Sequence, residues 1–331
     1  MKETLNKLIN HEILPKEEAK QILVNIANGA YKTSQIAAFL TVYMMRSVTI
    51  EELEGFRDAL LELCLAVDLA EYDPIDLCGT GGDGKDTFNI STLASFVTAG
   101  AGIHVTKHGN YGVSSKCGSS NVMEFLGIKF SNEADFLKKT IEEAGICVLH
   151  APLFHPAMKN VAPIRRELAV KTFFNMLGPM VNPAFPKNQM VGVFSLELAR
   201  MYGYLYQNTD KKFTILNALD GYDEISLTGD TKTISNNSEA MLRPADFGVE
   251  KVLQQEIVGG EDVAESAQIF MNILQGKGTE AQNNVVCANA GVAIATVQSI
   301  TPMEGFEKAK ESLFSGKGLQ ALKKIQELSK N

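Results

Sequence analysis

The chain has 331 residues, of which 45% are hydrophobic and 21% charged, and its formal net charge at pH 7 is -8. This composition is typical of a globular protein and allows one large domain or two ordinary ones. A duplex nucleic-acid binder usually carries a basic face, so we expect no nucleic-acid partner. No apolar run approaches the roughly 20 residues of a membrane span, and we expect no membrane partner.

The cysteines point to a reducing environment. There are five, an odd number, and none forms a C-x-x-C pair. This pattern argues against a disulfide framework and against a zinc site. The start of the chain, MKETLNKLINHEIL, lacks the unbroken apolar core of a secretory signal. We therefore expect a cytoplasmic protein.

The first 68 residues or so are expected to be helical. A capping box at Thr49 and Glu52 predicts a helix start in TIEELEGF. Apolar residues recur at helical spacing in TSQIAAFLTVYMM, namely Ile36, Phe39, Leu40 and Tyr43. Nothing in this stretch alternates as a strand does.

From Asp73 onward, strand and helix patterns alternate. The expected strands are 75–78, 103–109 and 146–152, and the expected helices are 91–102 and 131–145. Strands alternating with helices predict a mostly parallel sheet surrounded by helices. A helical stretch returns at 163–185, and strands resume at 189–195 and 212–219.

These patterns predict an α/β protein with a small all-helical domain and a larger sheet-containing domain. Neither the helical start nor the helical stretch in the middle would bury its apolar face alone. We therefore expect residues 1–70 and an inserted segment at about 164–186 to pack as one helical domain. The α/β domain would then comprise 71–163 and 187–331.

The segment GTGGDGKD, residues 79–86, resembles two phosphate loops without matching either. Gly84 and Lys85 fit the nucleotide-binding loop G-x-x-x-x-G-K-[ST], but Asp86 occupies the hydroxyl position. The dinucleotide pattern G-x-G-x-x-G is also present, yet no acidic residue stands about 20 positions further on. Both interpretations are therefore poorly supported.

A general anion site explains this segment better. Four glycines in six residues cost conformational entropy, which a plain turn rarely warrants. They allow backbone N–H groups to approach a large anion, and the helix predicted to begin near Asn89 offers further amides. The segment KHGNYGVSSKCGSS, 107–120, follows the next strand with more glycines and hydroxyls. Two such loops at strand ends favour a ligand with more than one phosphate group.

Four segments together resemble one known family. DLCGTGGDGKDTFNIST, KHGNYGVSSKCGSS, HPAMKNVAPIRREL and GYDEIS occur in this order and look like anthranilate phosphoribosyltransferases. The resemblance covers essentially the whole chain. It implies transfer of the phosphoribosyl group of 5-phosphoribosyl 1-diphosphate to anthranilate, with release of pyrophosphate, in tryptophan biosynthesis. It also implies a nucleoside phosphorylase-like fold with a hinge, Mg²⁺ as cofactor (two ions) and a homodimer formed through the helical domain.

The resemblance also assigns roles residue by residue. Asn110 and Arg165 would contact anthranilate, and Ser91, Asp223 and Glu224 would hold magnesium. The implied phosphoribosyl diphosphate site comprises Gly79, Thr80, Gly82, Asp83, Thr87, Asn89, Ile90, Ser91, Thr92, Lys107, His108, Gly109, Asn110, Tyr111, Gly112, Val113, Ser114, Ser115 and Ser119.

These residue types suit the implied chemistry. An aromatic amine is nucleophilic without deprotonation, so no dedicated acid or base is expected. Lys107 and magnesium would stabilise the charge of the leaving pyrophosphate. Arg165 would pair with the anthranilate carboxylate through two parallel hydrogen bonds. One departure stands out: the family usually has Asp where this chain has Asn121, which puts a supporting contact or helix cap in doubt.

Two other functions remain open at this point. A pyrimidine nucleoside phosphorylase has a similar fold and lysine motif, but Cys78, Gly79, Gly109 and Asn110 depart from its pattern. A non-catalytic nucleic-acid binder on the same scaffold is disfavoured by the net charge of -8 and by the retained Asp223 and Glu224.

Overall fold

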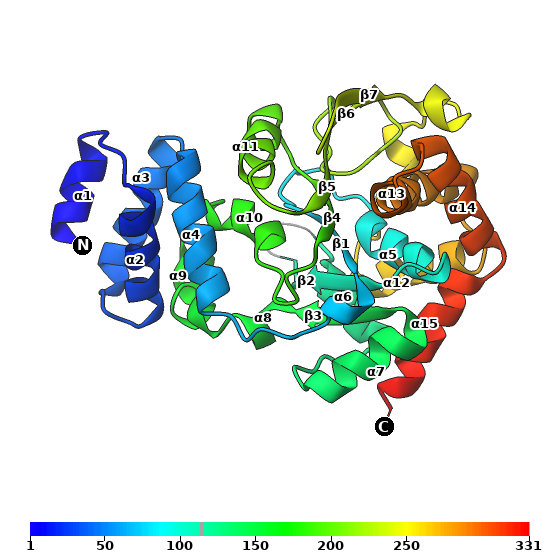
Figure 1. The fold of residues 1–331 in the computed structure, drawn as a ribbon, viewed down its shortest axis with the longest axis horizontal. Coiled ribbons are helices and arrows are strands. Elements are labelled where there is room, and N and C mark those ends of the chain that lie inside the picture. The colour runs from blue at the N-terminus through cyan, green and yellow to red at the C-terminus, as the bar shows by residue number, and fades with distance from the viewer. Residues whose placement is uncertain (113–115, 331) are drawn as a thin grey trace. The chain divides into compact units, whose positions relative to one another are not determined.

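The computed structural model describes residues 1–112 and 116–330, and the chain divides into two compact units. The helical unit comprises Met1–Val67 and Ala151–Phe185. The sheet-containing unit comprises Asp68–His150 and the described part of Pro186–Asn331 (Figure 1). The expected fold class, a small helical domain and a larger α/β domain, is confirmed.

The second segment of the helical unit begins earlier than the sequence predicted. It starts at Ala151 rather than near 164. Backbone and side-chain hydrogen bonds explain the difference. The Leu65 N–H donates to the Phe154 carbonyl oxygen at 2.8 Å, and Asn160 Nδ2 donates to the Ala27 carbonyl oxygen at 2.8 Å. Residues 151–163 thus pack with the first segment.

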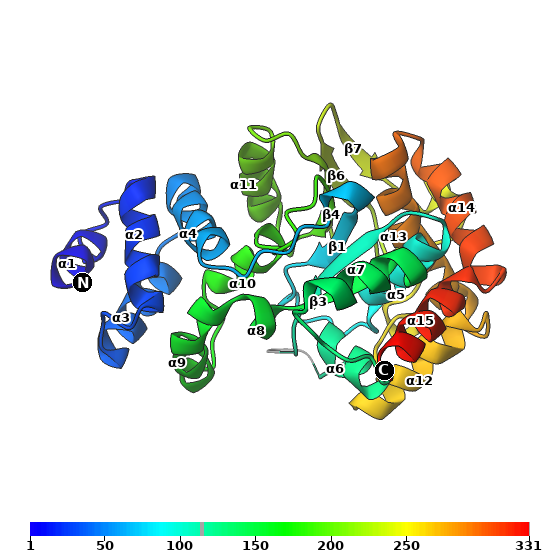
Figure 2. The same cartoon turned by 60° about the horizontal axis from the view of Figure 1, so that its bottom comes forward.

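The helical unit is built from short amphipathic helices. Its elements are α1 (Lys2–Ile9), α2 (Lys16–Ala27), α3 (Thr33–Met45), α4 (Ile50–Glu62), α8 (Ala151–Phe154), η2 (Pro156–Asn160), α9 (Ala162–Leu168), α10 (Phe174–Leu177) and η3 (Gly178–Met180). Helices α2 and α4 lie side by side (Figure 2). The predicted capping box begins α4, since the Glu52 N–H donates to Thr49 Oγ1 and the Thr49 N–H donates to Glu52 Oε2.

Aromatic rings form the centre of the helical unit. Phe56 stacks on Phe173 with 4.4 Å between ring centroids, and Phe39 meets Phe56 edge to face at 6.0 Å. Phe39 lies in the first segment and Phe173 in the second. This core explains why neither segment would bury its apolar face alone.

The sheet of the other unit has seven strands among the residues described. They are β1 (Ile75–Gly79), β2 (Val105–Gly109), β3 (Ile146–His150), β4 (Asn188–Gly192), β5 (Lys212–Ala218), β6 (Thr231–Ser235) and β7 (Glu239–Leu242), in the order β3-β2-β1-β4-β5-β6-β7. The first five are parallel, and β6 and β7 are antiparallel.

The strand order places a ligand site at β1. Strand β1 has β2 on one side and β4 on the other. The strands that come next in the chain, β2 and β3, lie to one side of β1, and the later strands lie to the other, so the strand order reverses at β1. In registered pairs, Gly79 at the end of β1 is opposite Gly192 of β4. The crevice at such a switch point, beyond the carboxyl ends of the strands, is where open α/β sheets bind ligands.

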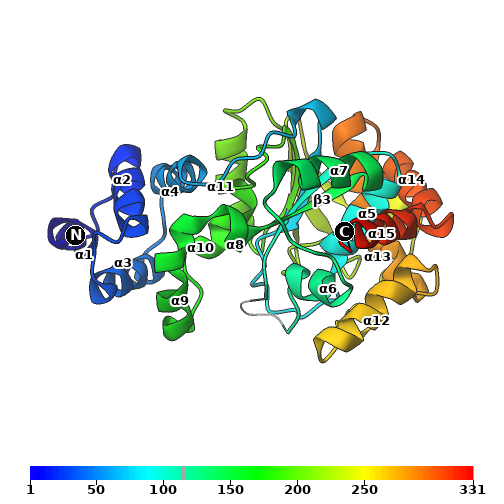
Figure 3. The ribbon, with the colours of Figure 1, turned by 90° about the horizontal axis from the view of Figure 1, so that it is seen from below.

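Helices cover both faces of this sheet. They are α5 (Ile90–Gly100), α6 (Ser119–Phe125), α7 (Ala134–Ala144), α11 (Leu196–Tyr206), α12 (Val263–Leu274), α13 (Glu280–Gln298), α14 (Pro302–Phe314) and α15 (Lys317–Leu328). Figure 1 shows α11 on one side of the strands and α5 and α13 on the other. Helix α15 lies beside α7, where Lys324 and Glu143 form a 3.3 Å ion pair (Figure 3).

No single helix in the described part of the chain is long and apolar enough to cross a membrane. Helices α13 and α14 reach the length and apolar composition of a membrane span only when taken as a pair, and the chain bends by 118° at their junction. Most of α13 is buried in the core of the sheet-containing unit.

Candidate active site

The glycine loop, residues 79–86, leaves the carboxyl end of β1 at the switch point. The Thr80 N–H donates to the Gly192 carbonyl oxygen at 2.9 Å, which fixes the first residue of the loop beside β4. Gly81 and Gly84 have φ values of 66° and 72°, a region that side chains disfavour. The loop conformation therefore depends on glycine at these two positions.

The acidic turn, residues 219–224, follows β5 and lies against the glycine loop. Asp223 is buried, and its Oδ2 accepts a 2.6 Å hydrogen bond from the Gly81 N–H. A Cβ atom on Gly79 would lie 2.9 Å from Asp223 Cγ, so only glycine allows this approach. Two segments some 140 positions apart in the chain are thereby joined at one site.

Burial and mutual repulsion disfavour the charged forms of the carboxylates of the acidic turn. Burial and the neighbouring charge of Asp83 raise the pKa of Asp223. Burial and the charge of Asp223 raise the pKa of Glu224 well above its usual range, against the opposing effect of Lys107. A cation bound beside them would offset the repulsion and lower both pKa values.

Lys107 brings a buried positive charge to the same place. Its ammonium donates to the Leu77 carbonyl oxygen at 2.6 Å and to Ser91 Oγ at 3.4 Å. Ser91 lies in the first turn of α5, and its backbone amide also lowers the pKa of Glu224. The structure therefore brings together the three predicted metal ligands, Ser91, Asp223 and Glu224, and the predicted electrostatic residue Lys107.

The start of α5 is placed as the sequence predicted. Asn89 is its N-cap residue, and Asn89 Nδ2 donates to the Cys117 carbonyl oxygen at 3.1 Å. Ile90 and Thr92 are each 1% exposed, backbone and side chain together, whereas Asn89 and Ser91 are partly exposed. A ligand at this helix start would therefore meet Asn89 and Ser91 first.

The second predicted loop begins at the end of β2. Lys107 and His108 are buried, whereas Asn110 and Tyr111 are exposed. The Tyr111 hydroxyl donates to Glu124 at 3.2 Å, and Ser119 Oγ donates to the Asn110 carbonyl oxygen at 3.3 Å. The predicted site residues Val113, Ser114 and Ser115 lie outside the described residues.

Asn121 performs the capping role that its identity put in doubt. Its Oδ1 accepts hydrogen bonds from the Gly112 N–H at 2.9 Å and from the Gly118 N–H at 3.0 Å. An amide oxygen accepts these bonds as a carboxylate would. The cap at the start of α6 is therefore present without the negative charge.

Arg165 is the one predicted site residue that belongs to the helical unit. Its Nη2 donates to Asn175 Oδ1 at 3.2 Å, and its guanidinium lies 5.3 Å from the centroid of the Phe174 ring. Burial lowers the pKa of Arg165, and none of the carboxylates described lies within ion-pair distance of it. An arginine held in this way is suited to a carboxylate from outside the chain.

Two buried polar atoms of the glycine loop indicate a ligand. Thr80 Oγ1 and Asp83 Oδ2 have no hydrogen-bond partner among the described residues. Buried polar atoms are nearly always paired, so each such atom calls for an explanation. A phosphate would accept from the Thr80 hydroxyl, and a ligand hydroxyl or the water of a hydrated cation would donate to Asp83 Oδ2.

The donor set suits magnesium rather than a metal with a full protein cage. No group of three or more His, Cys, Asp or Glu residues in the described chain is arranged to enclose a metal ion. Magnesium usually binds through one or two carboxylates, keeps several waters and takes further oxygens from substrate phosphates. Asp223 and Glu224, with Ser91 beside them, fit that requirement.

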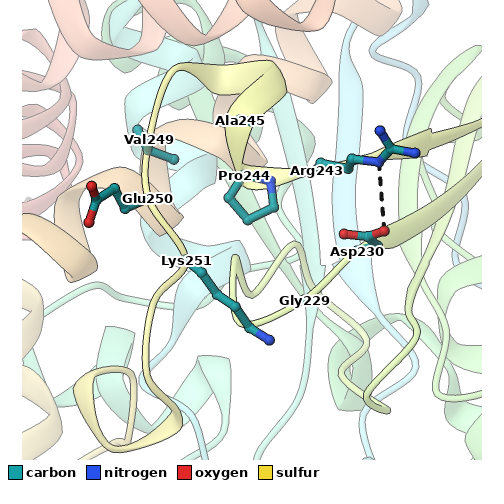
Figure 4. A pocket seen from close by; sticks show the side chains of 8 residues that line it. All are labelled: Gly229, Asp230, Arg243, Pro244, Ala245, Val249, Glu250 and Lys251. Atoms are coloured by element: carbon teal, nitrogen blue, oxygen red, sulfur yellow. Dashed lines mark ion pairs between the residues drawn. The ribbon is translucent and has the colours of Figure 1, made fainter.

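A separate surface hollow contains none of the predicted site residues. It is lined by Gly229, Asp230, Arg243, Pro244, Ala245, Val249, Glu250 and Lys251. Figure 4 shows Arg243 and Asp230 next to each other at one side of it, and the Arg243 Nε lies 3.8 Å from Asp230 Oδ2. Its positive and negative side chains are mixed, which gives no preference for an anionic ligand.

Three residues at the site were not predicted from the sequence: Gly192, Lys85 and Tyr222. Gly192 supports the acidic turn, since a Cβ there would overlap the Asp223 carbonyl oxygen. The Lys85 ammonium lies 4.6 Å from the centroid of the Tyr222 ring. Lys85 was noted only as a partial motif match, and no local pattern connects it with a residue so far along the chain.

The fold and the site define a glycosyltransferase of two domains. The model of the glycosyl transferase family a/b domain matches residues 71–319, and that of the family's helical bundle domain matches residues 2–64. Both the sheet-containing unit and the first helical segment are thus those of this family.

Comparison with individual relatives shows which kind of glycosyltransferase the chain resembles. The chain is 75% identical to the anthranilate phosphoribosyltransferase of Flavobacterium psychrophilum, over 99% of this chain and 100% of the relative. It is 72% identical to that of Christiangramia forsetii, with both chains covered fully. The crystal structure of the Thermus thermophilus anthranilate phosphoribosyltransferase matches with a TM-score of 0.91 and 30% identity, over 99% of each chain. The chain belongs to the anthranilate phosphoribosyltransferase family.

Proposed function

We propose that this protein transfers the 5-phosphoribosyl group of 5-phosphoribosyl 1-diphosphate to the amine of anthranilate, releasing pyrophosphate, as a step of tryptophan biosynthesis. Full-length identity of 72–75% to three curated relatives of that name supports this reaction. The pyrimidine nucleoside phosphorylase alternative is not favoured by these relatives. The observation that carries the proposal is the convergence of the glycine loop, Lys107 and the acidic turn at the switch point of the sheet.

The glycine loop and the start of α5 would bind the phosphoribosyl diphosphate. The unpartnered Thr80 Oγ1 and Asp83 Oδ2 would bond to this substrate or to the water of its magnesium ion. Backbone amides at the start of α5 would hold a phosphate group. A structure of the Saccharomyces cerevisiae enzyme in complex with PRPP and Mg, 26% identical with a TM-score of 0.90, supports this class of ligand.

Asp223, Glu224 and Ser91 would hold magnesium, with two ions as the expected number. Bound magnesium stabilises the negative charge that develops on the departing pyrophosphate. The raised pKa values of Asp223 and Glu224 support the assignment, because each carboxylate needs a nearby cation to ionise fully.

The chain's own residues would contribute position and charge. The buried Lys107 ammonium, fixed by Leu77 and Ser91, would face the charge that grows on the leaving group. Arg165 would pair with the anthranilate carboxylate and orient the amine, and Asn110 would make a further polar contact. The aromatic amine needs no general base, so catalysis rests on orientation and electrostatics.

We also propose that the protein is a cytoplasmic homodimer. Exposed apolar side chains on the helical unit support pairing through that unit: Ile9, Ile13, Met44 and Met45, with exposed fractions of 62%, 55%, 44% and 82%. Covering exposed apolar side chains with a partner surface is favourable in water. The free thiols of all five cysteines support a reducing compartment.

The reaction is tested by mixing purified protein with anthranilate, phosphoribosyl diphosphate and MgCl₂ and following anthranilate fluorescence. We expect a loss of fluorescence that requires all four components and that stops when Asp223 and Glu224 are both changed to alanine. Folded protein that leaves the fluorescence unchanged would refute the proposal. Phosphorolysis of uridine and thymidine is then the assay for the alternative reaction.

A further inference from the structure

Lys85 lies at the point where the glycine loop meets the acidic turn. Its ammonium is 4.6 Å from the centroid of the Tyr222 ring. Gly221, which precedes Tyr222, also lies close to Lys85: a Cβ atom on Gly221 would be 3.6 Å from Lys85 Cε. Tyr222 itself is 2% exposed and belongs to the core of the sheet-containing unit. Its ring therefore offers a fixed surface to a residue of a glycine-rich loop.

Lys85 contacts an aromatic ring although its own loop and the acidic turn carry several carboxylates. Asp83, Asp220, Asp223 and Glu224 all lie in the same two segments, yet in the part of the chain described no carboxylate is within ion-pair distance of Lys85. An ammonium paired with Asp223 or Glu224 would neutralise a carboxylate that the proposed magnesium site needs. On the Tyr222 ring it contributes a cation–π attraction without occupying any carboxylate.

The contact with Tyr222 complements the hydrogen bond between Gly81 and Asp223. The Gly81 N–H secures the beginning of the loop to the turn, and Lys85 secures its end. Between them lies Asp83, whose Oδ1 accepts the Lys85 N–H at 3.1 Å. Four glycines make an unanchored loop costly to order, so two anchors reduce the entropy lost when a ligand binds.

We propose that Lys85, held on the Tyr222 ring, is a positioning residue that fastens the glycine loop to the acidic turn and so preforms the site for magnesium and phosphoribosyl diphosphate. This inference rests on the proposed function for its ligand, but the contact itself is a property of the free protein. Lys85 acts through the loop, whereas a phosphate-binding lysine would act on the ligand directly. The two roles predict different behaviour in a double variant.

The first experiment measures the loop without any ligand. We expect Lys85→Met and Tyr222→Leu each to speed amide hydrogen exchange of a peptide covering residues 79–87, and the double variant to exchange no faster than either single one. Lys85→Arg keeps the cation and should exchange as the wild type does. Lys310→Met is the matched control, because Lys310 lies 5.6 Å from the Phe306 ring on α14. Unchanged exchange in Lys85→Met would overturn the inference.

The second experiment measures binding of phosphoribosyl diphosphate in the presence of MgCl₂ by calorimetry. The strength of a cation–π contact predicts that Lys85→Met and Tyr222→Leu weaken binding by between about two- and thirty-fold. The double variant should match the single ones, and Lys85→Arg should restore binding. If the losses of affinity in the two single variants instead multiply in the double variant, Lys85 and Tyr222 act independently. That result would overturn the inference and would indicate that Lys85 contacts a phosphate directly. If the wild type does not bind at all, the proposed function fails, and the exchange experiment still decides the role of Lys85.

Discussion

Gly192 and Asp223 lie so close together that a Cβ atom on Gly192 would overlap the Asp223 carbonyl oxygen. Gly192 ends β4, and Asp223 is in the acidic turn after β5. We expect Gly192→Ala to displace Asp223 and to lower the rate of anthranilate consumption at least about tenfold, because small displacements of positioned groups are costly in catalysis.

Gly203→Ala is the control for this prediction. Gly203 lies within helix α11, and a Cβ atom there would make only an ordinary contact with Ile234, at 3.5 Å. It should leave the rate near that of the wild type. Equal rates for Gly192→Ala and the wild type would show that the acidic turn tolerates the shift and would count against its placement in the site.

Glu52 is a buried charge that the helical unit depends on. Its side chain is fully buried and accepts hydrogen bonds from the Leu14 N–H, the Tyr43 hydroxyl and Arg46. Burial opposes its ionisation, but these hydrogen bonds and the Arg46 charge lower the pKa of Glu52 overall. We expect Glu52→Ala to reduce the free energy of unfolding by about 3–5 kcal/mol, because it leaves the Arg46 guanidinium, on a side chain only 10% exposed, without its partner.

Urea unfolding followed by circular dichroism measures this loss. The neighbouring Glu51 is exposed on the same helix, and Glu51→Ala should change the unfolding free energy by less than about 0.5 kcal/mol. Similar losses in the two variants would mean that the Glu52 network contributes nothing specific.

Asn121 should be replaceable by aspartate but not by an apolar residue. Its Oδ1 accepts the N–H groups of Gly112 and Gly118, and a carboxylate oxygen accepts the same bonds. We expect Asn121→Asp to keep the KM for phosphoribosyl diphosphate within about twofold. Asn121→Leu leaves both N–H groups without this acceptor and should raise that KM severalfold. Steady-state kinetics of the two variants distinguishes them, and equal KM values would contradict the capping role.

His155 should make the stability of the protein depend on pH. Burial lowers the pKa of His155 from its usual 6.5 to about 4. The unfolded chain therefore binds this proton at a higher pH than the folded one does. The resulting stability is complete above pH 6.5 and is lost as the pH falls from 6.5 towards 4, by about 3 kcal/mol at most.

Chemical unfolding of the wild type and of His155→Gln between pH 4 and 7.5 tests this dependence. The variant should lose less stability than the wild type over that range. His11→Gln, at an exposed position in the same unit, is the control and should follow the wild type. Parallel curves for the wild type and His155→Gln would contradict the assignment.

Local patterns predicted the elements that end at the site. The strand at 75–78 and the helix near 90 follow from short apolar runs, glycines and a helix start, and the structure has β1 at Ile75–Gly79 and α5 at Ile90–Gly100. The antiparallel pair β6 and β7 was not predicted. Its buried residues are two threonines and one leucine, Thr231, Thr233 and Leu242, and TKTIS and EAML carry little of the apolar alternation that marks a buried strand.

The site was predictable in its residue types but not in its contacts. Family resemblance identified Lys107, Asp223 and Glu224, and the structure brings them together. The approach of Gly192 to Asp223 and of Lys85 to Tyr222 depends on strand order and on the course of two loops. Neither contact has a local sequence signal, because its partners are separated by a strand and a helix or more.

The most direct test of the account is the dependence of the initial rate of anthranilate consumption on MgCl₂ concentration, in the wild type and in Asp223→Asn. The wild-type rate should rise to saturation with MgCl₂ and vanish when a chelator is added. Asp223→Asn should need at least about tenfold more MgCl₂ or lose at least about tenfold in rate, because one ligand has lost its charge. Identical MgCl₂ dependence in the two proteins would contradict the placement of magnesium at the acidic turn.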